Sequence, residues 1–334
     1  MRRVGQLYER IAEPENLRLA FWKACRGKRD RPEVREYGDR LGENLARLRS
    51  QLQEDGVEIG HYRFFTVRDP KERRICAASF PERVLHHAIM NVCEPVLERY
   101  AIHDSYACRT GKGMHAAVRR AQAFAQAFPW YLKLDVQRYF DSVHHETLLV
   151  LLERRFKDRR LLHLFRAIIS TYETAPGRGL PIGNLISQHC ANLYLGPLDH
   201  GVKETLRVRG YVRYMDDFVL WGDAKKALQD KRSEVAGFLG ERLKLTLKEN
   251  AQLNRSAIGL PFLGYRVFPS YVTLGLRARR RFARKLRAYE RRWFGGGWSE
   301  GDLQRHVEPL LAYVRFADTR GLRREVVGRL SVAT

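Results

Sequence analysis

The clearest hydrophobic pattern in the chain is a pair of apolar and aromatic segments that meet at two adjacent acids, within residues 211–220. Both segments are rich in residues that favour strands, so the pattern predicts a tight antiparallel hairpin with Asp216 and Asp217 at its tip. Two neighbouring carboxylates repel each other, and such a pair is tolerated mainly where water or cations neutralise it. The tip is therefore a candidate metal site. A solvated turn is the alternative interpretation, because Asp is common in turns.

A third acid stands at the end of a second predicted strand, in residues 130–136. Alternation with a period of two places Tyr131, Lys133 and Asp135 on one face and apolar residues on the other, so we expect a half-buried strand. One Asp that faces two others on a neighbouring hairpin suits Mg²⁺, which binds oxygen ligands from a few carboxylates and from substrate phosphates. Two such ions can activate a 3′-hydroxyl and stabilise the leaving pyrophosphate in an in-line displacement.

Further helices and strands are predicted on both sides of these acids. Helical spacing of apolar residues predicts helices within residues 7–25 and at 33–54, 82–99, 115–128, 224–243 and 277–292. Strands are predicted at 62–67, 74–77 and 243–248. The mixture of helices and antiparallel strands indicates an α+β fold.

Composition and charge narrow the class of function. With 334 residues, of which 44% are hydrophobic, the chain is long enough for two or three folded subdomains. Its 61 Lys and Arg against 38 Asp and Glu give a formal net charge of +23, which points to nucleic acid as a partner. Neither a membrane-spanning apolar run nor the apolar core of a signal peptide is present, so we expect a cytoplasmic protein without membrane association.

The motifs around the acids carry a resemblance. Asp135 together with Tyr214-Met215-Asp216-Asp217 resembles the palm active site of reverse transcriptases, and the resemblance covers nearly the whole chain. It implies a right-hand polymerase with fingers, a palm built on an antiparallel sheet, and a helical thumb. It also implies catalysis by Asp135, Asp216 and Asp217, with two Mg²⁺ ions held by these acids and Val136.

The same resemblance divides the chain into four parts. It implies an N-terminal helical extension at residues 1–60, fingers at 61–130, a palm at 131–265 and a helical thumb at 266–334, with residues 144–190 shared between palm and fingers.

Nucleotide-binding residues are implied in the same way. The family has phosphate-binding basic residues on a hairpin, and the corresponding residues of this chain are Lys71 and Arg73. Their positive charges suit a triphosphate. Phe140 falls where an aromatic ring leaves no room for a 2′-hydroxyl, and Lys248 resembles a palm lysine that approaches the nucleotide phosphates. Without the resemblance, the hairpin is a solvated surface, Phe140 a core residue and Lys248 a solvent-facing strand residue.

Three segments are expected to contact nucleic acid. The loop at residues 105–113 lacks the usual nucleotide-binding patterns, but its glycines let backbone amides approach a phosphate. An ordinary loop before a helix is an alternative interpretation that explains the glycines nearly as well. The resemblance implies a primer grip at 262–265, where glycine permits close approach. Residues 277–292 contain nine Lys and Arg residues and one acid, and their spacing predicts an amphipathic helix whose basic faces can bind the backbone of a duplex. The residues concerned are Arg109, Lys112, Phe262, Leu263, Gly264, Tyr265, Arg280, Arg284 and Arg287.

The segment Leu180-Pro181-Ile182-Gly183-Asn184-Leu185-Ile186-Ser187-Gln188 departs from most reverse transcriptases, which carry Gln at the position of Ile182 and Pro at that of Gln188. The combination resembles the reverse transcriptases of diversity-generating retroelements, whose products carry substitutions at template adenines. An apolar side chain at 182 cannot hydrogen-bond the incoming nucleotide as an amide can, which would weaken discrimination against wrong pairs. Ile182, Gly183 and Gln188 are accordingly expected at the nucleotide site.

The resemblance as a whole implies an RNA-directed DNA polymerase, a nucleotidyltransferase that makes adenine-mutagenic cDNA from a template-repeat RNA. The implied partners are template and primer RNA, the cDNA, deoxynucleoside triphosphates and a small basic oligomeric accessory protein, in a bacterial or phage-encoded system. A retron or abortive-infection reverse transcriptase is an alternative with similar chemistry. A non-catalytic RNA-binding protein with a polymerase fold is another, although the intact set of three acids speaks against it.

Overall fold

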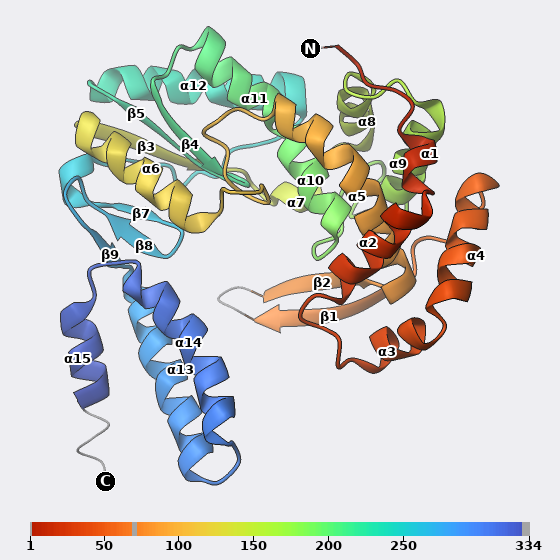
Figure 1. Ribbon diagram of the computed structural model, residues 1–334. Helices are drawn as coiled ribbons and strands as arrows, with labels where there is room; N and C mark the ends of the chain where they lie inside the picture. The colour runs from red at the N-terminus through yellow and green to blue at the C-terminus, as the bar shows by residue number, and fades with distance from the viewer. Residues whose placement is uncertain (1, 69–71, 329–334) are drawn as a thin grey trace.

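The computed structural model describes residues 2–68 and 72–328. This part of the chain contains three antiparallel sheets among its helices, which confirms the α+β expectation (Figure 1). None of the described helices combines the length and the apolar character that crossing a membrane requires.

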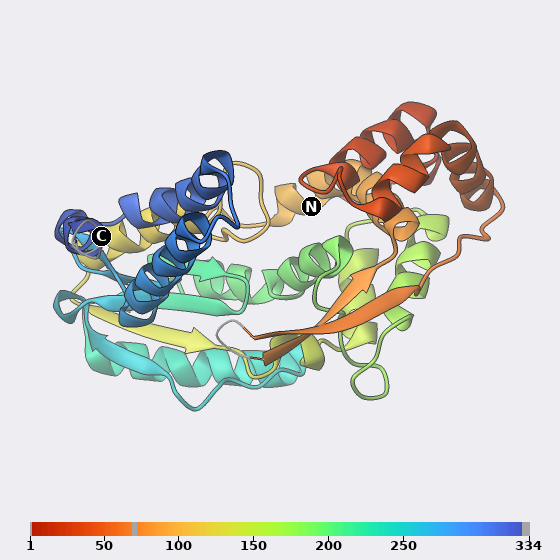
Figure 2. The same ribbon diagram turned by 90° about the horizontal axis from the view of Figure 1, so that it is seen from below.

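The four-stranded sheet has the strand order β4-β5-β3-β6 and lies to one side of the N-terminal helices, at the upper left of Figure 1. Its strands are β3 (Trp130–Asp135), β4 (Gly210–Tyr214), β5 (Asp217–Gly222) and β6 (Gln252–Arg255). Helix α6 (Met114–Ala127) packs against β4 and β5, and α12 (Lys225–Leu243) packs against β3, β5 and β6 from the opposite face (Figures 1 and 2). The predicted strands and helices at these positions are confirmed.

The predicted alternation of β3 is confirmed at Lys133 and Asp135, which are half-buried, but Tyr131 on the same face is fully buried, so the expectation of a half-buried strand holds only near the acids. Leu132 and Phe218 lie in the larger apolar core, together with the N-terminal helices and α12. Tyr131 and Val219 lie in a second core on the other face, formed with α6 and the C-terminal strands. The second core is built from residues far away in the sequence, so the alternation within β3 could not reveal it.

The part of the chain before β4 is mainly helical. Its helices are α1 (Tyr8–Ile11), α2 (Pro14–Cys25), α3 (Pro32–Asp39), α4 (Leu41–Gln53), α5 (Phe80–Tyr100), α7 (Tyr139–Ser142), α8 (His145–Glu153), α9 (Arg159–Ser170), α10 (Leu185–Tyr194) and α11 (Gly196–His200). The single helix predicted at 33–54 is divided into α3 and α4, because Arg40 leaves helical geometry with φ −118° and ψ 38°.

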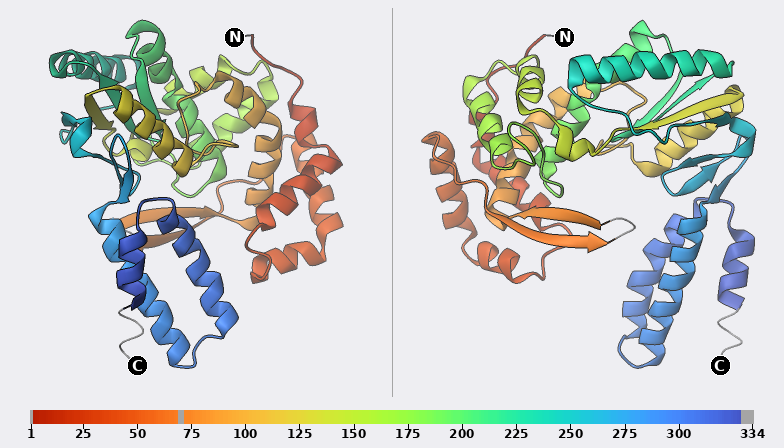
Figure 3. Two further views of the ribbon diagram at one scale, coloured as in Figure 1. Left: turned by 60° about the vertical axis from the view of Figure 1, so that its left-hand side comes forward. Right: turned by 180° about the vertical axis from the view of Figure 1, so that it is seen from behind.

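A two-stranded hairpin, β1 (Tyr62–Arg68) and β2 (Glu72–Ala78), extends from these helices towards the C-terminal part (Figures 2 and 3). Its base is tied to the segment before α10 by a hydrogen bond from Cys76 N to Ile182 O at 2.8 Å. Gly183 has φ +115°, and a Cβ there would lie 2.9 Å from Cγ2 of Ile75. Glycine is therefore required for this close contact between the hairpin and the segment.

The C-terminal part consists of a three-stranded sheet followed by helices. The elements are β7 (Leu260–Phe262), β8 (Tyr265–Val267), β9 (Val272–Leu274), α13 (Leu276–Phe294), α14 (Glu300–Arg315) and α15 (Arg320–Gly328). Helices α13 and α14 pack side by side as a helical hairpin that projects away from the four-stranded sheet (Figures 1 and 3). The predicted helix at 277–292 is thus confirmed.

The strand predicted at residues 243–248 does not form. Helix α12 continues to Leu243 and is closed by Lys244, whose φ of +53° reverses the chain. The segment that follows makes one isolated bridge, between Leu247 and Val136. It is nevertheless attached to the end of β3, because Lys248 N donates to Asp135 O at 2.8 Å.

Candidate active site

Three acids meet at one end of the four-stranded sheet. Asp135, the last residue of β3, is paired in antiparallel register with Asp217, the first residue of β5. Asp216 precedes Asp217 in the tight β4–β5 turn, where Met215 has the left-handed φ of +57°. The predicted convergence of one acid on a strand end with two on a hairpin is confirmed, and backbone pairing fixes it.

The environment of Asp216 and Asp217 disfavours the charged forms of their side chains. Burial, together with repulsion from Asp135, raises the pKa of Asp216 to about 6. Burial also raises the pKa of Asp217 to about 6, against the opposing charge of Lys133. Three carboxylates crowded in this way favour any cation that can approach them.

Two lysines provide part of the compensating charge. Lys248 Nζ lies 2.5 Å from Asp135 Oδ1, and Lys133 Nζ lies 3.0 Å from Asp217 Oδ2. The position of Lys248 is set by the attachment of its backbone to β3. The sequence does not predict that Lys133 neutralises Asp217, although strand alternation places Lys133 on the same face as Asp135.

The oxygen atoms at this end of the sheet fit a hard cation such as Mg²⁺. Asp217 Oδ1 is buried and accepts no hydrogen bond from the described residues. No group of three or more His, Cys, Asp or Glu in the described part of the chain forms a site that could hold a metal ion by itself. Mg²⁺ sites in proteins that act on phosphates commonly use one or two carboxylates, with substrate phosphates and water as the other ligands. Val136 could contribute only its backbone carbonyl, because its side chain is apolar and buried.

The residues predicted to bind nucleotide come from three adjoining elements. Arg73 lies on the exposed first half of β2, whereas Lys71 falls outside the described residues. Phe140 is half-buried against the larger core, and its carbonyl accepts a hydrogen bond from Leu180 N at 2.8 Å. The bond between Cys76 and Ile182 joins β2 to the same 180–188 segment. Arg73, Phe140 and the 180–188 segment therefore belong to one connected part of the fold.

The loop at residues 105–113 is held mainly by hydrogen bonds to neighbouring residues of the protein. Arg109 donates to both carboxylate oxygens of Glu98 and to the carbonyls of Ile102 and Ser105, and its side chain is 9% exposed. These contacts weigh against nucleic-acid binding by Arg109, which stays a prediction. Lys112 Nζ donates to His103 O at 3.0 Å and remains near the surface.

Cys108, in the same loop, lies close to another predicted site residue. Its thiol is exposed and donates to Gln188 Oε1 at 3.2 Å. The loop therefore adjoins the nucleotide-binding segment through the predicted residue Gln188.

The predicted primer grip forms a tight two-residue turn between β7 and β8. Phe262 pairs with Tyr265, and Leu263 and Gly264 have φ of +50° and +85°. Lys133 Nζ donates to Pro261 O at 2.9 Å, so the lysine that neutralises Asp217 also contacts β7. The turn is thereby linked to the acids through a single ammonium group.

Two other parts of the molecule gather basic residues. Arg280, Arg284 and Arg287 are exposed on α13. A cavity of about 1280 Å³ lies between the N-terminal helices and the β1–β2 hairpin. Its ionisable lining residues are Lys28, Arg31, Arg40, Arg47, His61, Arg63 and Arg83, with the acids Glu33, Glu36 and Asp39. No sequence pattern predicts this cavity, because its lining comes from separate helices and strands.

Comparison with known proteins assigns the class. Residues 68–266, more than half of the chain, match the family described as reverse transcriptase (RNA-dependent DNA polymerase). The chain belongs to this family of enzymes. All three acids lie within the matched residues.

Individual relatives are distant. Protein YkfC of Escherichia coli K12 is 26% identical over 275 residues, which cover 66% of this chain and 72% of YkfC. The group II intron-encoded protein LtrA of Lactococcus lactis is 21% identical over 269 residues, which cover 58% of this chain and 44% of LtrA. A truncated apo telomerase from Candida tropicalis has a similar fold, with a TM-score of 0.51, 11% identity and coverage of 64% of this chain and 55% of that chain. The chain thus spans less than half of LtrA.

The raised pKa of Asp216 predicts a pH-dependent effect on stability. The folded chain holds the proton of this carboxyl more tightly than the unfolded chain, so the free energy of unfolding falls as the pH rises from about 4 to about 6. At pH 7.5 without divalent cations, we expect the free energy of unfolding of Asp216→Asn to be about 1–2 kcal/mol higher than that of the parent, because the variant has no buried charge at this position. Screening by solvent keeps this difference below the full effect of the pKa shift.

Urea unfolding at a series of pH values measures this difference, which should shrink as the pH is lowered towards 4. Asp223→Asn, at an exposed acid just after β5, is the control and should match the parent. If Asp216→Asn is the less stable protein at pH 7.5, the proposed cost of the buried charge is wrong.

Proposed function

We propose that this protein is an RNA-directed DNA polymerase that extends a primer along an RNA template by Mg²⁺-dependent nucleotidyl transfer. The observation that carries the proposal is the pairing of Asp135 with Asp217, with Asp216 beside them in the adjoining turn. Membership of the reverse transcriptase family supports this class of reaction, as does the similarity to LtrA, a group II intron-encoded protein.

The proposal assigns the parts of the chain to a right hand. Residues 61–130 would form the fingers, 131–265 the palm and 266–334 the thumb, with 1–60 as an N-terminal extension and 144–190 shared between palm and fingers. The arrangement that supports it is the four-stranded sheet flanked by two projections, the β1–β2 hairpin and the α13–α14 hairpin (Figure 1).

The acids would hold two Mg²⁺ ions. Asp135 and Asp216 are the main ligands in this proposal, with Asp217 and the carbonyl of Val136 beside them. Bound Mg²⁺ would neutralise the triphosphate and favour ionisation of the primer 3′-hydroxyl. Lys248, whose ammonium group lies 2.5 Å from Asp135 Oδ1, would deliver a proton to the departing pyrophosphate in this proposal.

Substrate selection would involve the adjoining elements. Lys71 and Arg73 would bind the triphosphate by charge-assisted hydrogen bonds. The half-buried ring of Phe140 would exclude a 2′-hydroxyl by contact with the sugar. The fixed backbone around Gly183 supports a nucleotide-facing role for Ile182 and Gln188, because it ties their segment to the β1–β2 hairpin.

Nucleic acid would contact several separate surfaces. The β7–β8 turn at 262–265 would support the primer end, and Lys112 remains a candidate phosphate contact at the 105–113 loop. Arg280, Arg284 and Arg287 would bind the duplex backbone. The basic cavity beside the β1–β2 hairpin is large enough for further phosphate contacts.

The finer proposal is a mutagenic polymerase of a diversity-generating retroelement. Ile182 supports it, since an apolar side chain there lacks the amide that would hydrogen-bond a correctly paired nucleotide. The template would then be a template-repeat RNA, and a small basic oligomeric protein would act as an accessory. A retron, abortive-infection or group II intron reverse transcriptase is the alternative, and relatives such as LtrA favour the last of these.

Removal of a proposed metal ligand tests the reaction. We expect Asp135→Ala and Asp216→Ala each to abolish primer extension with Mg²⁺, because nucleotidyl transfer depends on charge held by ions at these acids. Binding of primer–template should persist, because it comes from many phosphate contacts over a chain of net charge +23.

Extension on a gel and binding by fluorescence anisotropy measure the two effects. Asp223→Ala, an exposed acid at the other end of β5, is the control and should extend primers like the parent. Near-parental extension by either Asp135→Ala or Asp216→Ala would mean that the metal assignment is wrong.

The basic face of α13 gives a separate prediction. The double variant Arg284→Glu, Arg287→Glu should bind primer–template more weakly and with a flatter salt dependence. Each lost phosphate contact removes a released counterion, so the log–log slope should fall by about 0.7 to 0.9 per contact.

A charge-matched control is Lys225→Glu, Lys226→Glu at the start of α12, where both lysines are exposed. This control should weaken binding less and leave the slope near that of the parent. An unchanged slope in the α13 variant would show that this helix does not contact the duplex.

The identity of residue 182 gives the test of the mutagenic proposal. We expect the parent to misincorporate chiefly opposite template adenine, and Ile182→Gln to lower that error by restoring a polar partner for the nucleotide. A gain of about 1.4 kcal/mol in discrimination corresponds to roughly a tenfold lower error rate.

Sequencing of cDNA from a defined RNA measures substitution at adenines and at the other bases. Ile182→Leu is the control, because it keeps an apolar side chain and should keep the adenine errors. Equal adenine errors in the parent and in Ile182→Gln would refute the role of Ile182. A faithful parent would instead favour the retron-like or intron-like alternatives.

A further inference from the structure

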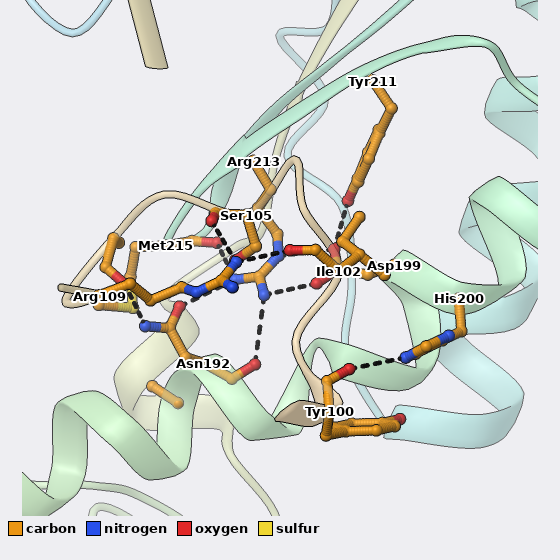
Figure 4. A network of polar contacts seen from close by, with 12 residues as sticks. Tyr100, Ile102, Ser105, Arg109, Asn192, Asp199, His200, Tyr211, Arg213 and Met215 are labelled. Carbon is orange, nitrogen blue, oxygen red and sulfur yellow. Dashed lines mark hydrogen bonds and ion pairs between the residues drawn. The ribbon is translucent and has the colours of Figure 1, made fainter. Parts of the chain in front are cut away.

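A fully buried ion pair, formed by Arg213 and Asp199, lies next to the β4–β5 turn (Figure 4). Arg213 on β4 is 1% exposed, and Asp199 on α11 is 0% exposed. Nε and Nη2 of Arg213 donate to the two carboxylate oxygens of Asp199 at 2.7 and 2.6 Å. Burial removes both charges from water, and such pairs are often no more stabilising than apolar residues of the same size. The pair therefore calls for an explanation other than stability.

The other donors of the guanidinium reach the turn and a neighbouring helix. Nη1 donates to the carbonyl of Met215 at 3.0 Å and to Oδ1 of Asn192 at 3.1 Å. Nη2 also donates to the carbonyl of Asn192 at 3.2 Å. With the two bonds to Asp199, all five N–H groups of Arg213 have acceptors. The guanidinium is thus fixed by α10 and α11 and in turn holds the β4–β5 turn.

The carbonyl of Met215 belongs to the peptide unit that leads into Asp216. Met215 has φ +57°, a conformation that residues with a Cβ adopt rarely. Without a hydrogen bond to its carbonyl, this peptide could rotate towards a more favourable conformation. Because the Asp216 side chain projects from the same backbone, rotation of the peptide would change the direction of the carboxylate.

The backbone of Arg213 is held as firmly as its side chain. Its N–H donates to the carbonyl of Asp104 and its carbonyl accepts from Tyr106 N, both at 2.9 Å. Asn192 Nδ2 donates to the carbonyl of Ala107 at 2.7 Å. The segment at 104–107 therefore holds both the backbone of Arg213 and the side chain of Asn192, which accepts a hydrogen bond from the guanidinium. These hydrogen bonds connect the β4–β5 turn to the 104–107 segment and to α10.

We propose that Arg213 is a positioning residue of the polymerase site. Its guanidinium fixes the Met215–Asp216 peptide and thereby the mutual geometry of Asp216 and Asp135. This inference rests on the proposed function, because it assigns Arg213 a purpose in the same reaction. A change at Arg213 should lower the affinity of the acids for divalent cations and leave the binding of primer–template and of deoxynucleotide largely unchanged.

Arg213→Lys tests this role. A lysine keeps the charge opposite Asp199, but its compact ammonium group cannot reach Asp199, Asn192 and Met215 together. We expect the affinity for Mn²⁺, measured by electron paramagnetic resonance on the protein without nucleic acid, to fall about tenfold. The Mg²⁺ concentration for half-maximal primer extension should rise by a similar factor, while KM for deoxynucleotide and Kd for primer–template stay within about twofold.

Arg160→Lys is a matched control. The guanidinium of Arg160 likewise donates to a carboxylate, that of Asp55, and to two carbonyls, those of Leu52 and Gln53, but it lies between α4 and α9. Its replacement removes the same kind of contacts without touching the turn. Mn²⁺ affinity and the Mg²⁺ requirement should therefore match the parent.

Asn192→Ala provides a milder variant in case Arg213→Lys does not fold, as judged by circular dichroism and thermal unfolding. It removes one acceptor of Nη1 and the hydrogen bond to the carbonyl of Ala107, and leaves the pair with Asp199 intact, so we expect a smaller loss of Mn²⁺ affinity in the same direction. A folded Arg213→Lys or Asn192→Ala protein with parental Mn²⁺ affinity would overturn the proposal. If the parent extends no primer, the proposed function fails, but Mn²⁺ binding still decides the role of Arg213.

Discussion

The repulsion among three carboxylates at one end of a sheet is the constraint on which the rest of this structure depends. Asp135 and Asp217 cannot move apart, because the register between β3 and β5 places them opposite each other. That register is rigid in turn, since apolar cores cover both faces of the sheet. The surrounding residues therefore have to provide positive charge, and Lys248 and Lys133 do so from two different directions.

The distribution of charge separates two tasks. The chain carries a net charge of +23, which attracts a polyanion to the molecule as a whole. The three acids form a local negative region within it, where burial raises the pKa of Asp216 and of Asp217 and favours a neutralising cation. Behind them, Arg213 and Asp199 compensate each other, so this pair adds little net charge to the site. Positive charge is thus spread over the chain as a whole, whereas the negative charge of the acids is concentrated at one end of the four-stranded sheet.

Much of this fold could be predicted from the sequence, because short-range periodicity determines it. The strands that carry Asp135 and Asp217, and the helices α5, α6, α12 and α13, follow apolar spacing that each segment contains within itself. The burial of Tyr131 could not be predicted in this way, since its core partners lie on β7, β8 and α13. Arg213 in an apolar strand indicates a buried partner, but nothing in the spacing identifies Asp199 on α11 as that partner.

Lys133 illustrates how local and long-range information combine. Its place on the face of Asp135 follows from strand alternation, whereas its contacts depend on the C-terminal sheet. One ammonium group lies 3.0 Å from a carboxylate oxygen of Asp217 and donates to the carbonyl of Pro261 at 2.9 Å. A shift of β7 would therefore remove one of the two acceptors and alter the charge that Asp217 experiences. The position of the β7–β8 turn and the electrostatics of the acids are thus physically coupled, although 44 residues of sequence separate Asp217 from Pro261.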